Sequence, residues 1–177
     1  MPSPSSRLAP SCLVVMGPSG TGKTTTAKLL SQRLGWQFAE ADEFHPPANI
    51  EKMSAGIPLN DEDRAPWLAL IRDWISERAL MGESCVITCS ALKRRYRDVL
   101  REARARVRFV QLDAPQELIA TRMAARKGHY MPPSLLVSQY ADFQPLQDDE
   151  DGARIPVDRA PDAVVSETLA QLDLANA

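Results

Sequence analysis

The stretch Gly17-Pro18-Ser19-Gly20-Thr21-Gly22-Lys23-Thr24 matches the phosphate-binding pattern G-x-x-x-x-G-K-[ST] at every fixed position. It follows an apolar run at residues 12–16 and opens a helical pattern at residues 22–34. A strand, a glycine-rich turn and a helix start form the context in which this pattern binds phosphate groups, which makes a chance match a poor explanation. We therefore predict a P-loop at this position.

Each residue type in this loop suits phosphate binding for its own reason. Glycines let backbone N–H groups turn inward, and the helix N-terminus adds partial positive charge. Lys23 can reach the β- and γ-phosphates of ATP, and the Thr24 hydroxyl can complete the coordination shell of Mg²⁺. We therefore predict ATP and Mg²⁺ as cofactors. The predicted ATP-binding residues of the loop are Gly17, Pro18, Ser19, Gly20, Thr21, Gly22, Lys23, Thr24 and Thr25.

The rest of the chain alternates apolar runs with helical patterns. We expect strands at residues 12–16, 36–39, 85–89, 107–112 and 154–157. We expect helices at residues 22–34, 46–53, 61–81, 92–104, 115–126, 132–143 and 162–172. Such alternation indicates βαβ units and a parallel sheet. The prediction is an α/β, three-layer P-loop kinase fold, with a mostly five-stranded parallel sheet, helices on both faces and a helical lid.

The domain organisation follows from the same patterns. Residues 1–11 are rich in Pro and Ser, and we expect them to form a frayed N-terminal tail. Residues 12–177 are of a suitable length for a single domain. We place the lid at about residues 122–145.

Two acidic residues follow the second predicted strand. Glu40 and Asp42 lie at the strand end, beyond which the ligands of parallel sheets bind. Alternation along an extended segment would place both carboxylates on the same side. One could orient the Mg²⁺ shell and the other could accept the proton of an attacking hydroxyl, or both could be surface acids that cap the next helix. His45 follows and is open to a structural or a catalytic role.

Basic residues near the same edge of the sheet could bind anions. Arg64 could bind a substrate carboxylate through two hydrogen bonds, or it could lie on the surface of its helix. Lys93 follows the third predicted strand, which places it well to meet an anion. We expect the acidic residues 149–152 to form a solvated loop. We likewise expect a solvated face to contain Arg94, Arg95, Arg97 and Arg101.

A further basic cluster occurs at Arg122 and Arg126, which are four residues apart and share a helix face. Cations there suit a lid that closes over the phosphates and neutralises the transferring charge. Gly128 and the prolines at 132–133 could form its hinge. The alternative is a helix C-terminus stabilised by positive charge.

Composition and missing motifs argue against several classes of protein. The formal net charge of −2 gives no basic surface for nucleic acid. No apolar stretch approaches the roughly 20 residues of a membrane span. The chain has no Asn-Lys pair, so the N-K-x-D element of a GTPase-type switch is missing. We therefore expect a cytoplasmic protein that acts on small molecules, with neither nucleic acid nor membrane as a partner.

Five segments carry a resemblance to a known family. The chain resembles the small bacterial-type gluconokinases, relatives of shikimate kinase in the nucleoside-monophosphate-kinase-like group, from about residue 13 to residue 169. The segments are residues 16–24, Asp42-x-x-His45-Pro-x-x-Asn49-Ile-Glu-Lys-Met53, Gly56-x-Pro-Leu-Asn-Asp-x-Asp-Arg64-x-Pro-Trp67, Cys89-Ser-Ala-Leu-Lys-Arg-x-Tyr-Arg-Asp98 and Arg122-x-x-x-Arg-Lys-Gly-His129. The middle three are far more diagnostic than the P-loop.

The resemblance implies a homodimeric cytoplasmic enzyme that phosphorylates the 6-hydroxyl of D-gluconate with ATP and Mg²⁺. It implies Asp42 as the base, with Lys23, Arg122 and Arg126 as the other catalytic residues. The arginines of the lid, with Arg159 in the loop near adenine, would also bind ATP. The implied gluconate-binding residues are Asp42, His45, Arg64, Lys93 and His129.

One position departs from the family pattern. The first acid after the second strand is often Asp in that family, and here it is Glu40, which we predict as a metal ligand together with Thr24. Two other functions stay open. The chain could be a kinase of another small polyhydroxy acid such as shikimate, or a nucleotide switch without enzymatic activity.

Overall fold

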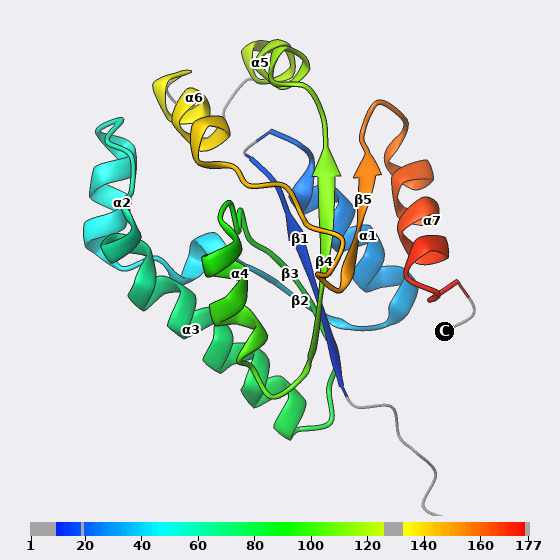
Figure 1. Cartoon of the computed structure of the whole chain (residues 1–177). Coiled ribbons are helices and arrows are strands. Elements are labelled where there is room, and N and C mark those ends of the chain that lie inside the picture. The colour runs from blue at the N-terminus through cyan, green and yellow to red at the C-terminus, as the bar shows by residue number, and fades with distance from the viewer. Residues whose placement is uncertain (1–9, 19, 126–132, 176–177) are drawn as a thin grey trace, which may run out of the picture.

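The computed structural model describes residues 10–18, 20–125 and 133–175. Five parallel strands form one sheet in the order β2-β3-β1-β4-β5 (Figure 1). The strands are β1 (Ser11–Met16), β2 (Gln37–Glu40), β3 (Cys85–Thr88), β4 (Arg106–Asp113) and β5 (Gly152–Pro156). The predicted α/β fold with a five-stranded parallel sheet is confirmed.

Seven α-helices and one short 3₁₀ helix lie in the described part of the chain. They are α1 (Lys23–Leu34), η1 (Ala41–Phe44), α2 (Pro47–Ser54), α3 (Asp61–Leu80), α4 (Arg94–Arg101), α5 (Gln116–Ala125), α6 (Pro133–Asp142) and α7 (Pro161–Gln171). None of these helices is both long and apolar enough to cross a membrane. Helices α5 and α6 lie beyond the carboxyl ends of the strands (Figure 1).

The three layers follow from the alternation of side chains along β1. Leu13 and Val15 point into one core, which α1 and α7 cover. Val14 and Met16 point into the other core, which α3 and α4 cover. Both faces of the sheet are therefore apolar, as expected for a parallel sheet between two layers of helices.

Most predicted elements are present with ends shifted by one or two residues, and two differ more. Helix α4 is shorter than predicted at both ends, because Ala91 has a left-handed φ of 44° and the helix ends at Arg101. The helix η1 was not predicted. Asp42 therefore lies in a 3₁₀ turn, and the alternation argument that paired it with Glu40 does not apply.

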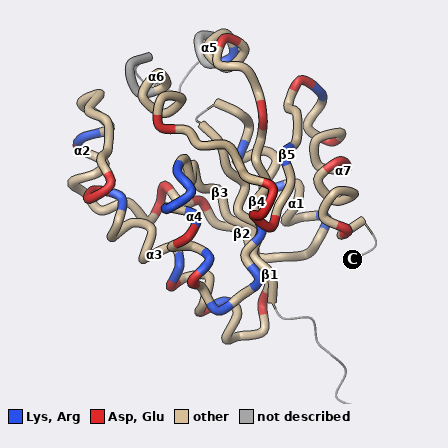
Figure 2. Tube along the Cα trace, viewed as in Figure 1, with Lys and Arg blue, Asp and Glu red and all other residues tan. Residues whose placement is uncertain are grey.

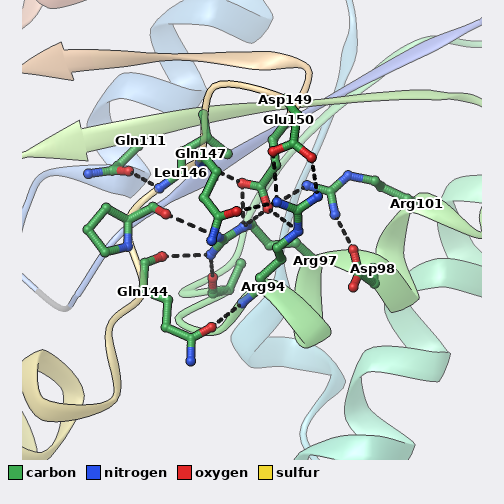
Figure 3. A network of polar contacts seen from close by, with 12 residues as sticks. Arg94, Arg97, Asp98, Arg101, Gln111, Gln144, Leu146, Gln147, Asp149 and Glu150 are labelled. Carbon is green, nitrogen blue, oxygen red and sulfur yellow. Dashed lines mark hydrogen bonds and ion pairs between the residues drawn. The ribbon is translucent and has the colours of Figure 1, made fainter.

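The prediction of a solvated basic face on α4 is wrong for Arg97, whereas Arg95 is exposed as predicted. The Arg97 side chain is 0% exposed, and so is the side chain of Glu150, which was predicted to lie in a solvated loop. Arg97 Nε donates to Oε1 and Oε2 of Glu150 at 3.1 and 3.0 Å (Figure 3). Arg101 approaches the same carboxylate at 2.9 Å, and Arg94 forms two hydrogen bonds with Asp149. These contacts join α4 to the segment before β5.

Backbone oxygens complete the surroundings of Arg97. Its Nη1 donates to Ala91 O and to Gln144 O, both at 3.0 Å. Gln144 in turn accepts a hydrogen bond from the backbone N–H of Arg94 at the start of α4. The buried ion pair thus holds the chain that leaves α6 against the turn that follows β3 (Figure 3). Elsewhere along the described chain, basic and acidic residues are interspersed (Figure 2).

Candidate active site

The P-loop lies between β1 and α1, and its glycines have conformations that other residues adopt only with strain. Gly17, Gly20 and Gly22 have φ values of 139°, 84° and 92°. A Cβ on Gly17 would also lie 3.1 Å from Leu112 O, closer than such contacts normally come. These glycines therefore let the backbone of the loop turn, as the sequence predicts. Ser19 lies outside the described residues.

Hydrogen bonds hold this loop to its neighbours. The backbone N–H of Gly17 donates to Ser90 O at 3.2 Å, which ties the loop to the end of β3. Lys23 Nζ donates to Gly17 O at 2.8 Å. Burial lowers the pKa of Lys23, and the nearby charges of Asp42 and Glu40 act in the opposite direction. Thr24 and Thr25 are exposed at the start of α1, where they can meet a ligand.

A cavity of about 280 Å³ lies beside Lys23. It brings together the P-loop, η1, the turn after β3, and helices α2, α3 and α6. The lining residues are Lys23, Asp42, His45, Ile50, Met53, Pro58, Leu59, Arg64, Trp67, Ser90, Ser138 and Gln139. Its wall therefore combines an apolar side from α2 and the loop after it with two cations, a carboxylate and an imidazole.

Asp42 and His45 occupy the same part of this wall. The Asp42 side chain is 89% exposed, and its Oδ1 lies 4.0 Å from His45 Nε2. The His45 ring stacks on Trp67 with a centroid separation of 4.2 Å and an interplanar angle of 12°. Burial lowers the pKa of His45, although the charge of Asp42 opposes the shift and that of Arg64 adds to it. The site thus places an imidazole beside a carboxylate.

Arg64 is a buried residue of the site, and the alternative of an ordinary arginine on the helix surface is wrong. Its Nη1 donates to the Tyr96 hydroxyl at 2.8 Å and lies 3.6 Å from Asp142 Oδ2 at the end of α6. Its guanidinium also lies over the Tyr96 ring, 5.2 Å from the centroid. These contacts hold a positive charge in the cavity wall, where a substrate anion could meet it.

A second cavity, of about 200 Å³, also borders the P-loop. Gly20, Gly22 and Thr25 line it together with Arg122 and Arg159. Arg122 Nη2 donates to Val157 O at 2.9 Å, which holds this arginine beside the loop after β5. The loop therefore borders both a cavity with acid–base groups and a cavity with two arginines.

Comparison with known proteins identifies the family of this chain. A model of the AAA domain matches residues 13–146. The gluconokinase of Gluconobacter oxydans is 52% identical over 162 residues, which cover 92% of this chain and 91% of that protein. The chain belongs to the gluconokinase family.

Solved structures agree with the family assignment. The crystal structure of a gluconokinase from Sinorhizobium meliloti is 42% identical, with a TM-score of 0.84, and the match covers 93% of both chains. An unliganded sugar kinase from Janibacter is 50% identical, with a TM-score of 0.90 over 94% of this chain and 96% of that one. The chain therefore shares its fold with a gluconokinase and a sugar kinase of known structure.

The structure brings most of the residues that the resemblance implied into these two cavities. Asp42, His45 and Arg64 line the first, while Arg122 and Arg159 line the second. Glu40 ends β2, close enough for its charge to act on Lys23. Arg126 and His129 lie outside the described residues.

Lys93, by contrast, is paired with an acidic side chain. Its Nζ donates to Asp61 Oδ1 at 3.2 Å, and it is not among the residues that line the first cavity. Arg95 and the Tyr96 hydroxyl contact the same carboxylate. The role of Lys93 in gluconate binding therefore stays a prediction, and binding would require this lysine to leave Asp61.

Several cavity residues were not predicted. Ser138 and Gln139 come from α6, and Ser90 from the turn after β3. Ser90 belongs to the segment at residues 89–98 that resembles the family, but no role was assigned to it. Ser138 and Gln139 belong to none of the motifs, so the sequence offers no signal for those two. Asn49 contacts His45 and stands in the segment that resembles the family, but no role was assigned to it.

Proposed function

We propose that the protein transfers the γ-phosphate of ATP to the 6-hydroxyl of D-gluconate, giving 6-phospho-D-gluconate and ADP. The observation that carries this proposal is the shared cavity, because Lys23 of the P-loop and Asp42 line the same wall. The 52% identity to the Gluconobacter gluconokinase supports gluconate as the acceptor.

The reaction is a single displacement at phosphorus. The P-loop amides bind the ATP phosphates, and Lys23 exchanges its bond to Gly17 O for the β- and γ-phosphates. The bond from the 6-hydroxyl oxygen to the γ-phosphorus forms while the bond to the β–γ bridging oxygen breaks. Asp42 accepts the hydroxyl proton, and ADP carries away the electron pair of the broken bond.

The acceptor is held by complementary charge. Arg64 supplies a buried cation in the cavity wall, and the carboxylate of gluconate is its natural partner. His45 and Ser90 offer polar groups to the hydroxyls of the substrate, and the apolar side contributed by Ile50 and Met53 covers its carbon chain. The family resemblance also implies Lys93 and His129 as contacts of the bound gluconate.

The Mg²⁺ site would be assembled only with the nucleotide. Within the described residues no three His, Cys, Asp or Glu side chains cluster as a metal site. The Thr24 hydroxyl and the Glu40 carboxylate are oxygen donors, which Mg²⁺ prefers, and phosphate oxygens and water fill the remaining positions. The residues present therefore fit the ion. When bound, Mg²⁺ neutralises charge on the phosphates.

The lid, the assembly and the location are proposed on the resemblance. We propose that residues 122–145 close over the phosphates, with Arg122 and Arg126 facing the transferring group, and that residues 12–177 act as one domain. The family resemblance also supports a homodimer in the cytoplasm. Light scattering on the purified protein at micromolar concentration would give twice the mass of the chain for a dimer and the mass of one chain otherwise.

A coupled assay of ADP release tests the proposed function. The protein is incubated with ATP, Mg²⁺ and one member of a panel that contains D-gluconate, shikimate and other sugar acids. ADP release that depends on gluconate supports the proposal. Release that depends only on another acid would make the protein a kinase of that acid. Nucleotide binding without any release that depends on an acceptor would favour a switch.

A further inference from the structure

The side chain of Asn49 contacts both the ring of His45 and the backbone of α3. Asn49 Nδ2 donates to the backbone oxygen of Asp63 at 2.9 Å and lies 3.2 Å from His45 Nδ1. A carbonyl oxygen only accepts hydrogen bonds, so the amide must present its NH₂ group to Asp63 O. The second hydrogen of this NH₂ group is then directed at His45 Nδ1. That nitrogen acts as an acceptor, and the proton of the neutral ring lies on Nε2.

The surroundings also fix the direction of the ring. Asn49 is 3% exposed, and His45 stacks on Trp67 with an interplanar angle of 12°. Rotation of the ring by half a turn would lose the hydrogen bond from Asn49 and turn Nε2 away from Asp42. The Nε2–H group therefore points to the side of the cavity where Asp42 lies.

The gap between His45 and Asp42 suits a bound hydroxyl. His45 Nε2 and Asp42 Oδ1 are 4.0 Å apart, too far for a direct hydrogen bond. One oxygen atom can lie about 2.8 Å from both of them. A hydroxyl donates one hydrogen and accepts through two lone pairs, so it can donate to Asp42 and accept from Nε2–H at the same time.

We propose that Asn49 is a positioning residue for phosphoryl transfer, because it holds His45 as a neutral Nε2–H donor that orients the acceptor hydroxyl whose proton Asp42 accepts. This inference rests on the proposed function. Protonation of Nδ1 would set an N–H group against the NH₂ of Asn49. Burial and the charge of Arg64 also disfavour the imidazolium, and the charge of Asp42 favours it.

The first test measures the tautomer directly in the unliganded wild-type protein. The chain has two histidines, so ¹⁵N NMR of the imidazole nitrogens is readily assigned with a His45→Gln variant as reference. We expect a non-protonated Nδ1 and a protonated Nε2 for His45 at pH 7. The opposite tautomer would overturn the inference, and this measurement requires neither a substrate nor a folded Asn49 variant.

The second test reverses the polarity of the contact. In Asn49→Asp a carboxylate replaces the amide, so it accepts from Nδ1–H and leaves Nε2 of the neutral ring without a proton. We expect kcat at pH 8 to fall about tenfold or more. As the pH falls, formation of the imidazolium restores Nε2–H. The loss should therefore shrink toward lower pH, which a merely structural defect would not produce.

Lys52→Met is the matched control. Lys52 pairs with Asp63 at 2.9 Å and also links α2 to α3, but it does not contact His45. Its kcat should stay close to that of the wild type at all pH values. Equal losses in Lys52→Met and Asn49→Asp would overturn the inference and assign Asn49 a structural role. Wild-type protein that releases no ADP with gluconate would overturn the proposed function and this inference with it, whereas a wrong tautomer overturns the inference alone.

Discussion

Lys23 is bonded to a backbone oxygen of its own loop in the unliganded protein. Bound ATP offers this ammonium group stronger, charge-assisted partners, because phosphate oxygens carry negative charge. Lys23→Met removes the cation and keeps most of the volume of the side chain. We expect kcat for ADP release to fall by at least about 10²-fold. Thermal unfolding should show an intact fold, and a variant with wild-type turnover would contradict the role of Lys23.

Asp42 and Glu43 are adjacent acids of η1, and only Asp42 lines the cavity. Asp42→Asn keeps the shape of the side chain but cannot accept the hydroxyl proton. We expect kcat to fall by about 10²- to 10⁴-fold, with unchanged binding of an ATP analogue. Glu43→Gln is the matched control and should keep near wild-type activity. Similar losses in both variants would show that η1 acts through its overall charge and that Asp42 is not the base.

At the scale of elements, a buried ion pair joins α4 to the segment before β5. Glu150→Gln would leave Arg97 without its carboxylate in a site with no exposure. Breaking a buried pair in this way costs about 3–5 kcal/mol. Denaturant unfolding should show that loss, whereas Asp149→Asn, at an exposed partner of Arg94, should cost much less, because water screens an exposed ion pair. Equal losses of unfolding free energy in the two variants would mean that Glu150 is well solvated.

The same carboxylate predicts a dependence of stability on pH. Burial alone would raise the pKa of Glu150, but hydrogen bonds from Arg97, Gln147 N and Arg101 outweigh burial and lower it. Because the pKa is lower in the folded state, ionised Glu150 contributes its full stabilisation at pH values above its pKa in the unfolded chain, which is about 4.3. The stabilisation is lost as the pH falls through the pKa of the folded state. The difference in unfolding free energy between wild type and Glu150→Gln should therefore shrink below about pH 4. A difference that stays constant down to pH 2 would contradict a lowered pKa for Glu150 in the folded protein.

The sequence predicts the elements well where their pattern is long and periodic. All five strands and all seven α-helices were expected, because a buried parallel strand is an apolar run and a surface helix repeats every 3.6 residues. The four residues of η1 are too few for any periodicity. The pair of Arg97 and Glu150 spans 53 positions, and a charge pattern does not reveal so distant a partner. For the same reason Ser138 and Gln139 of α6 could not be assigned to the cavity.

For the whole molecule, the P-loop borders two cavities with different chemistry. Asp42, His45 and Arg64 line one cavity, and Arg122 and Arg159 line the other. This arrangement suits phosphoryl transfer, because a nucleotide and an acceptor can both bind beside the same loop. The sequence predicted these residues from strand ends and family resemblance, while their division between two cavities became visible only in the fold.

A crystal structure with D-gluconate, Mg²⁺ and a non-hydrolysable ATP analogue tests this arrangement most directly. The 6-hydroxyl of gluconate should lie in the 280 Å³ cavity, about 3 Å from an Asp42 oxygen and in line with a γ-phosphate bound by Lys23. Gluconate bound outside this cavity, or inside it with Asp42 turned away from every hydroxyl, would contradict the proposed mechanism.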